Sequence, residues 1–245
     1  MNLVIARITL RQLLSRRRTL LLVLLGALLL LVAFIRRISG TTDGSDPRFT
    51  ADLLDRLGVA VLMPIVALLF GTGAMGAELE EGTAVYILAK PISRLSVVVT
   101  KLTVAVICSV LLTSVPLLLA GLLSGGSDAT GLAVGFAVAA AIGSIMYCTI
   151  FLALSLVTSR AFIFGLAYVL IWEGFLATLF PGTRTFSVHQ QTLAFAKAIA
   201  NPPAAVFNTD LALGTAVVAA AAIVILAFAI AVRRLSRIEI AGEVA

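Results

Sequence analysis

Glu173 is the residue whose type and position most suggest chemistry, because it is the only acid deep inside an apolar run. It lies twelve residues after the start of the apolar segment 161–180, which is roughly 18 Å along a helix at about 1.5 Å per residue. A carboxyl group at that depth must pair, take up a proton or face water, so a functional role is the default hypothesis. Tyr168 and Trp172 are close enough in sequence to line the same cavity. The alternative, of equal weight, is a protonated or hydrogen-bonded Glu173 that ties helices together, for example through a Ser or Thr of another helix.

The other reactive side chains do not form a catalytic or metal-binding set. His189 is the single histidine, and Cys108 and Cys148 lie in different apolar segments. We interpret His189 as a polar residue at a membrane surface and the cysteines as small apolar residues. We therefore expect no catalytic residue, metal ion or cofactor in this chain. The sequence also lacks the G-x-x-x-x-G-K-[ST] phosphate-binding loop, so we expect that the chain itself does not hydrolyse ATP.

Two glycine patterns occur in apolar segments. Residues 71–76 read Gly-Thr-Gly-Ala-Met-Gly and match G-x-G-x-x-G, but a dinucleotide site needs a strand before this pattern and a helix after it. Here the pattern ends an apolar segment, which favours close helix packing. Gly131 and Gly135 form a small-xxx-small pair. This pair is a candidate helix or subunit contact, although ordinary packing is the favoured interpretation.

The composition excludes a soluble fold. Hydrophobic residues make up 61% of the 245 residues and charged residues only 12%, whereas a soluble domain needs roughly a quarter of its residues charged. The net charge of +6 does not indicate a nucleic-acid partner, because the basic residues flank apolar segments and do not form one patch. We therefore predict an all-α, polytopic membrane protein.

Six segments are suited to crossing a membrane, since a helix needs about 20 apolar residues to span a core of about 30 Å. They are 19–35, 57–77, 102–123, 131–158, 161–180 and 211–232. With this assignment, twelve of the eighteen Lys and Arg residues lie on one side of the membrane. The excess of basic residues on that side predicts that both termini are cytoplasmic.

Residues 1–18 are predicted to form an amphipathic helix at the cytoplasmic membrane surface. Its apolar residues and its arginines fall on adjacent sides of a helical projection, namely Leu3, Ala6, Leu10, Leu13 and Leu14 beside Arg7, Arg11 and Arg18. Arginine then meets lipid headgroups while leucine enters the acyl boundary. The alternative, with even odds, is a basic anchor that has no further role.

The cytoplasmic loop 78–96 contains a short predicted helix. Thr83 is a plausible N-cap, and Pro91 ends the helix at Lys90. The helix 83–90 carries the apolar residues 85–88 outside the membrane, where they are exposed unless another protein covers them. The alternative is a connector that folds back on its own bundle. Ser93 is placed to cap the next helix.

The outer segment 181–210 is predicted to contain a further helix. Leu193, Ala196, Ile199 and Ala200 share one helical face, and Pro202-Pro203 stops the helix. We expect it to lie in the outer interface or to dip into the membrane.

The cytoplasmic loop resembles that of the type-two ATP-binding-cassette exporter permeases. The residues that match in order are Glu78, Gly82, Thr83, Pro91, Ser93, Arg94 and Lys101. The resemblance implies that the loop is a coupling helix seated in a groove of a separate ATPase subunit. It assigns this contact to Glu78, Glu81, Gly82, Thr83, Val85, Tyr86, Leu88, Pro91, Ser93 and Arg94.

The same resemblance implies the assembly and its cargo. Two ATPase subunits would bind ATP and Mg, and a second permease copy, as in a homodimer, would complete the transporter in a bacterial plasma membrane. Spans one, two and five would line a pathway for export of a hydrophobic or amphipathic substrate by alternating access. Short re-entrant helices would close the outer end of that pathway.

A second hypothesis is a membrane-embedded enzyme or assembly factor that uses Glu173 and the outer segment. Such a protein needs several polar catalytic groups at one depth, and this chain offers one acid and one distant histidine. The exporter hypothesis is therefore the leading one.

Overall fold

The structure, a computed structural model, describes residues 3–14, 17–39, 47–80, 93–125 and 129–237. Most of these residues are helical, and no strand occurs among them. The long helices are α2 (Arg17–Ile38), α4 (Met63–Glu80), α6 (Arg94–Gly125), α7 (Thr130–Val157) and α11 (Leu213–Arg237). The predicted all-α class is confirmed.

Shorter elements extend the long helices or connect them. The chain begins with α1 (Leu3–Leu14), and α4 is preceded by α3 (Pro47–Leu53) and the π-helical η1 (Leu54–Leu62). After α7 come α8 (Ala161–Ala167), the π-helical η3 (Tyr168–Leu176), α9 (Ala177–Leu179), the 3-10 helix η4 (Pro181–Phe186) and α10 (Val188–Ala200).

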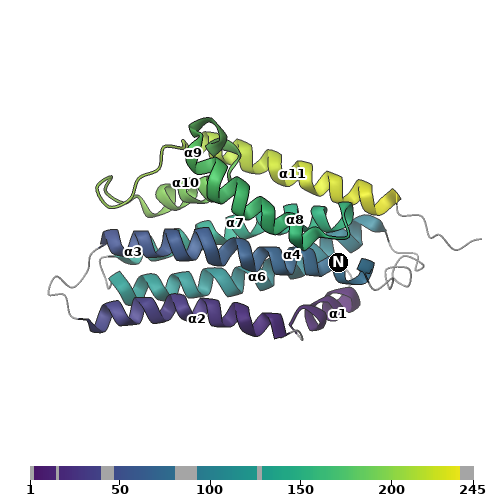
Figure 1. The fold of residues 1–245 in the computed structure, drawn as a ribbon, viewed down its shortest axis with the longest axis horizontal. Helices are drawn as coiled ribbons and strands as arrows, with labels where there is room; N and C mark the ends of the chain where they lie inside the picture. The colour runs from purple at the N-terminus through teal and green to yellow at the C-terminus, as the bar shows by residue number, and fades with distance from the viewer. Residues whose placement is uncertain (1–2, 15–16, 40–46, 81–92, 126–128, 238–245) are drawn as a thin grey trace, which may run out of the picture.

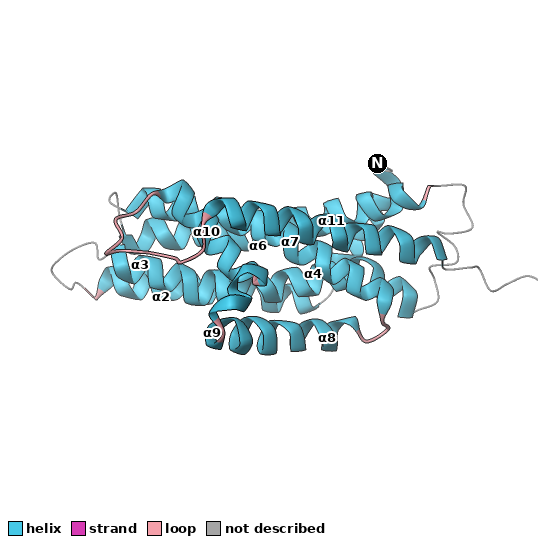
Figure 2. Cartoon of the chain, turned by 90° about the horizontal axis from the view of Figure 1, so that it is seen from above, coloured by secondary structure: helices cyan, strands magenta, loops and turns pink. Residues whose placement is uncertain are grey.

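The long helices run side by side along the longest axis of the molecule (Figure 1). The bundle therefore has two ends, which we name by their short helices. The α1 end holds α1, the end of α4, the start of α6 and the end of α11, whereas the α10 end holds α3, α10 and the start of α11. The view from above shows the same two ends, with α8 and α9 along one side (Figure 2).

Helix α7 lies at the centre and packs against α4, α6, α10 and α11. Its buried positions include Gly135, Ala139, Ala140 and Gly143, and such small residues let neighbouring helices approach closely within a membrane. A buried hydrogen bond of 3.1 Å between Thr113 and Ser144 adds a polar link between α6 and α7.

Within the described part of the chain, five helices are long and apolar enough to cross a membrane. They are Thr19–Ile38, Pro47–Gly76, Arg94–Gly125, Thr130–Val157 and Leu213–Ser236, and each contains most of one predicted span. The remaining predicted span, 161–180, forms the shorter apolar helix Ala161–Leu176 followed by α9. It ends at Phe180, whose backbone is extended, because the proline at 181 disfavours helical geometry in the residue before it.

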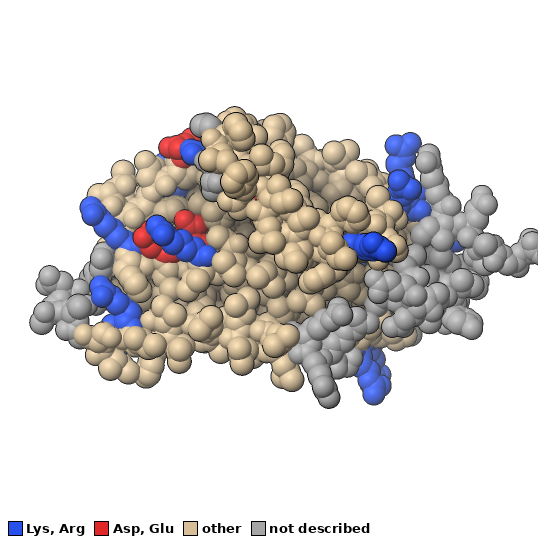
Figure 3. All heavy atoms as spheres, in the orientation of Figure 1, with Lys and Arg blue, Asp and Glu red and all other residues tan. Residues whose placement is uncertain are grey.

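Charge is distributed as a bilayer requires. On the face shown in Figure 3, basic side chains of the described residues lie towards both ends, acidic ones lie towards the α10 end, and an uncharged belt lies between the two ends. A charged group within the hydrocarbon core is costly, so this belt marks the part of the surface that suits lipid.

Helix α1 is confirmed, but part of the apolar face that was predicted to meet lipid packs on the bundle. Ile5, Thr9 and Leu13 are buried against the bundle, whereas Leu10 and Leu14 are exposed together with Arg7 and Arg11. The apolar residues thus divide between a face that packs on protein and a face that is free for lipid. Arg18 belongs to α2, since the described helix α1 ends at Leu14 and α2 begins at Arg17.

Helix α10 enters the bundle alongside α7. Gly143 of α7 faces Thr192, and Gly135, about two turns nearer the α10 end, faces Ala196 and Ala200. Asn201 ends the helix with a left-handed backbone, φ 44°, a conformation that Asn adopts more readily than most residues. The outer segment therefore contains a helix that dips into the fold.

Candidate functional site

Glu173 is buried in η3 and accepts hydrogen bonds from three donors. The Ser187 hydroxyl donates to Oε2 at 2.5 Å, the Val188 backbone N–H donates to Oε1 at 2.9 Å, and the Tyr168 hydroxyl donates to Oε1 at 3.2 Å. The side chain is 8% exposed. Both carboxyl oxygens are therefore engaged by the protein itself.

Two of these donors begin α10. Ser187 is the N-cap of α10, and its side chain also accepts a hydrogen bond from the Gln190 backbone N–H at 3.1 Å. The first amides of a helix have no partner within it, and a helix N-terminus carries partial positive charge. A carboxylate at this point satisfies a free amide and complements the charge, so Glu173 joins η3 to α10. This is the structural alternative considered for Glu173, with Ser187 as the hydroxyl partner.

An aromatic cluster lies beside this carboxyl group. Tyr147 of α7 stacks on Phe151 at 5.6 Å between ring centroids, and Phe151 meets Tyr168 edge-on at 6.3 Å. Tyr147 is fully buried. Sequence reasoning paired Glu173 with Tyr168 but missed Tyr147 and Phe151, because they lie on another helix. Trp172, the third candidate pathway residue, is half-buried next to Glu173.

His189 forms a second link between α10 and the bundle. Its Nε2 lies 2.8 Å from Oδ1 of Asp55 in η1, and both side chains are partly buried. The predicted polar role of His189 is therefore a specific contact with Asp55, which precedes the second predicted span 57–77. Sequence reasoning did not identify this partner, since 134 positions separate the two residues.

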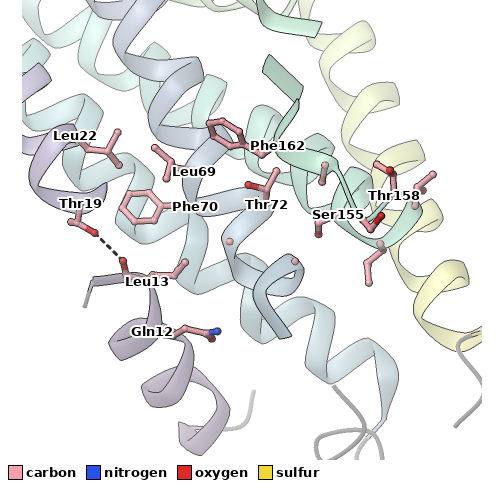
Figure 4. A pocket seen from close by; sticks show the side chains of 16 residues that line it. Gln12, Leu13, Thr19, Leu22, Leu69, Phe70, Thr72, Ser155, Thr158 and Phe162 are labelled. Atoms are coloured by element: carbon pink, nitrogen blue, oxygen red, sulfur yellow. Dashed lines mark hydrogen bonds between the residues drawn. The ribbon is translucent and has the colours of Figure 1, made fainter. Parts of the chain in front are cut away.

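A cavity of about 290 Å³ lies at the α1 end, between α1, α2, α4, the end of α7 and the start of α8 (Figure 4). We call it the α1 cavity. Its lining residues are Gln12, Leu13, Thr19, Leu22, Leu69, Phe70, Thr72, Gly73, Gly76, Ser155, Leu156, Val157, Thr158, Ser159, Ala161 and Phe162. Its walls thus mix apolar side chains with hydroxyl groups.

The glycines of residues 71–76 have two different roles. A Cβ atom on Gly71 would lie 2.8 Å from Cβ of Phe151, so this glycine permits close packing of α4 on α7. Gly73 and Gly76 instead line the α1 cavity. The packing interpretation is confirmed for Gly71, and a Cβ atom on Gly73 would lie 3.2 Å from Cδ2 of Leu13 in α1, whereas one on Gly76 would lie at the ordinary distance of 3.7 Å from Cβ of Ser155.

Most of the predicted coupling loop lies outside the described residues. This applies to Glu81, Gly82, Thr83, Val85, Tyr86, Leu88 and Pro91. The loop is flanked by Glu78, near the end of α4, and by Ser93. The predicted cap is confirmed, because the Ser96 backbone N–H donates to the Ser93 hydroxyl at 3.3 Å.

Arg94 and Lys101 belong to α6. Arg94 was predicted in the loop 78–96 and Lys101 just before the span 102–123, but α6 begins at Arg94, which is half-buried, and Lys101 is fully buried within this helix. The Lys101 ammonium donates to the Ala74 carbonyl of α4 at 2.7 Å. Lys101 therefore fastens the two helices that flank the predicted coupling segment.

Comparison with known proteins identifies the family. Residues 12–180 match the family described as ABC-2 family transporter protein. No curated protein matches the chain in sequence. The matched range contains the α1 cavity, the α4–α6 connection and Glu173. Members of this family are transport components that are not themselves catalytic and that generally work with an ATP-binding-cassette subunit. The chain belongs to the ABC-2 transporter family and is a membrane permease subunit of an ATP-binding-cassette transporter.

Proposed function

We propose that this permease exports a hydrophobic or amphipathic molecule by alternating access. Two copies of the chain would work with two ATPase subunits, which bind ATP and Mg. The α1 end would face the cytoplasm of a bacterial cell, with both termini on that side. The distribution of Lys and Arg supports this orientation.

The observation that carries the proposal is the position of the α4–α6 connection. Helices α4 and α6 meet this connection at the α1 end, and the buried hydrogen bond from Lys101 to Ala74 holds them together there. A force applied to the predicted coupling helix 83–90 would therefore act on two long helices as one unit.

A movement of α4 at the α1 end would be transmitted to the α10 end by contacts between α4, η1 and α10. Helix α4 continues into η1, whose Asp55 contacts His189 of α10. Met63, the first residue of α4, lies at Gly143 together with Thr192 of α10. The π-helical turns of η1 and η3 add points where helices commonly deform at functional sites. A shift of α4 would thus reach α10 directly.

The lining of the α1 cavity supports the implied pathway. The cavity brings together α2, α4 and α8, which belong to predicted spans one, two and five. Glu173, Trp172 and Tyr168 lie further along the same fifth segment, and we keep them as candidate pathway residues.

The decisive experiment is co-purification of the full-length chain with its ATPase subunit, followed by ATP hydrolysis assays with candidate cargoes. The double variant Val85→Asp/Leu88→Asp places charges on the predicted coupling helix. We expect it to lose the ATPase subunit and cargo-stimulated hydrolysis, because a buried unpaired charge in an interface core is strongly unfavourable.

The matched control is Phe186→Asp, which places a charge at an exposed apolar residue of η4 at the other end of the molecule. This variant should keep the ATPase subunit. An intact complex with the Val85→Asp/Leu88→Asp variant would refute the coupling assignment. Transport by the purified chain without an ATPase would refute the proposed function as a whole.

A further inference from the structure

We propose that the α1 cavity binds an uncharged amphipathic molecule whose head group donates hydrogen bonds, as a long-chain alcohol does. Its volume of about 290 Å³ is close to the lower limit of ligand pockets, roughly 300 Å³, and suits one small molecule. We expect the isolated chain to bind this molecule without an ATPase subunit. The use of the cavity as the loading point for cargo rests on the proposed function.

The hydroxyl groups of the cavity determine the hydrogen-bonding character of the ligand. Thr19 donates to the Leu13 carbonyl at 2.9 Å, Thr72 to the Leu68 carbonyl at 2.6 Å, and Ser155 to the Leu152 carbonyl at 2.8 Å. Each hydroxyl has one hydrogen and two acceptor lone pairs. Since the hydrogens of these three hydroxyls are used within the fold, the three side chains offer acceptors to a ligand, and a head group that donates hydrogen bonds matches them.

The remaining lining favours a neutral ligand with an apolar tail. Among the lining residues that the structure describes, none is Lys, Arg, Asp or Glu. Leu22, Leu69, Phe70 and Phe162 contribute apolar surface from three different helices. A charged head group placed here would lose hydration without gaining an opposite charge from these walls, whereas an alkyl chain would be favourably buried.

Gly76 leaves part of the α1 cavity unfilled because it has no side chain. Of the side chains that the structure describes, a Cβ atom on Gly76 would meet Cβ of Ser155, at the ordinary contact distance of 3.7 Å. A larger side chain at Gly76 would therefore extend into the cavity without a clash at its first carbon. This makes Gly76→Leu a variant that fills the cavity while the surrounding helices keep their positions.

The cavity lies where a molecule from the membrane surface can reach it. Leu13 of α1 lines it, while Leu10 and Leu14 on the other side of the same helix are exposed and suited to lipid. Figure 4 shows Leu13 and Thr19 joined across the α1–α2 connection at the cavity wall. A bound molecule would thus contact α1, α2 and α4 together, and α4 leads to the predicted coupling segment.

Quenching of a tryptophan in the cavity tests the proposal. The full-length chain carries Phe162→Trp in a Trp172→Phe background, which leaves one tryptophan, and is placed in phosphatidylcholine nanodiscs. The probes are ω-bromoundecanol, its methyl ether, which has no donor, and the anion ω-bromoundecanoate. We expect saturable quenching by the alcohol, at least fivefold weaker binding of the ether, and no saturation with the anion.

Control variants distinguish quenching by a molecule bound in the cavity from quenching by molecules dissolved in the lipid. Phe164→Trp in the same background places the reporter on the same helix at an exposed residue outside the lining, where quenching should rise without saturation. Gly76→Leu should abolish the saturable component. Thr72→Val, which removes one acceptor at nearly constant volume, should weaken alcohol binding about fivefold, as expected for one neutral hydrogen bond.

A second measurement, the unfolding temperature, needs no introduced tryptophan. The alcohol should raise the unfolding temperature of the unaltered chain more than the ether does, because a ligand that binds the folded state stabilises it. Equal binding of alcohol and ether, stronger binding of the anion, or quenching without saturation would each overturn the proposal. If the chain forms the ATPase complex but does not bind the alcohol, the cavity site alone is refuted. If the chain binds the alcohol but forms no complex with an ATPase subunit, only the proposed function is refuted.

Discussion

At the residue scale, two deeply buried charged side chains among the described residues, Glu173 and Lys101, each contact a helix near one of its ends. Glu173 accepts from the first amide of α10, and Lys101 donates to a carbonyl in the last two turns of α4. A helix carries partial positive charge at its N-terminus and partial negative charge at its C-terminus. Each side chain therefore lies at the end that matches its sign, which lowers the cost of keeping it in an apolar bundle.

Replacing Glu173 should loosen α10. Glu173→Gln keeps the shape but turns one acceptor into a donor that faces the Ser187 hydroxyl or the Val188 amide. We expect a loss of about 1–3 kcal/mol in the free energy of unfolding, measured by denaturation in detergent. Ser187→Ala should cost about 1 kcal/mol, and the double variant less than the sum, because both changes remove the same interaction.

The same variant tests the role of Glu173 in the pathway. Full transport by Glu173→Gln across the pH range, corrected for the amount of folded protein, would leave Glu173 with a structural role only. Additive losses in the double variant would instead contradict the hydrogen-bonded link to Ser187.

At the scale of elements, α10 is the part of the fold that depends most on close packing. It lies against the glycine positions of α7 and contacts η1 through His189 and η3 through Glu173. Three separate elements therefore determine where this helix enters the bundle. Any motion of α4 and η1 relative to α7 would change that position.

Two glycines on α7 provide a matched pair to test this packing. A Cβ atom on Gly135 would lie 2.6 Å from Cβ of Ala200 and 3.1 Å from the Ala196 carbonyl oxygen, whereas one on Gly131 would lie 3.7 Å from the Ala200 oxygen. Gly135→Ala should displace the α10 backbone and cost about 1–3 kcal/mol. Gly131→Ala should be neutral or slightly stabilising, since alanine favours helix.

Hydrogen exchange of residues 188–200 is the measurement that checks this pair. We expect faster exchange in Gly135→Ala and unchanged exchange in Gly131→Ala. Equal exchange in both variants would show that α10 does not depend on this contact.

At the scale of the whole molecule, the apolar faces of α2 and α11 remain uncovered by the chain itself. These helices lie at opposite edges of the view in Figure 1, and their apolar windows are only 22% buried. In a membrane such faces meet lipid or a second copy of the chain. The proposed homodimer would cover part of them without any change in the bundle.

The proposed orientation is testable by thiol labelling in intact cells. Cys108 and Cys148 are buried, so we would replace both with alanine and introduce Ser39→Cys at the α10 end or Ser236→Cys at the α1 end, where both serines are exposed. A membrane-impermeant reagent should label the Ser39→Cys variant in intact cells and the Ser236→Cys variant only after lysis. The reverse pattern would place the termini outside.

The sequence by itself determined the features that depend on neighbouring residues. Long apolar runs predicted the helices, the basic flanks predicted an orientation, and Ser93 predicted the start of a helix, because hydropathy and capping are local properties. The loop residues between Glu78 and Lys101 indicated the family, which the match over residues 12–180 confirmed.

Only the tertiary structure decided which distant groups meet. It placed Ser187 and Val188 on Glu173, paired His189 with Asp55, buried Lys101 against α4 and turned Leu10 and Leu14 of α1 outward. It also showed that five segments of the chain together line the α1 cavity. These features follow from the packing of whole helices, in which each side chain's partner is set by the approach of another helix and not by its own sequence neighbours.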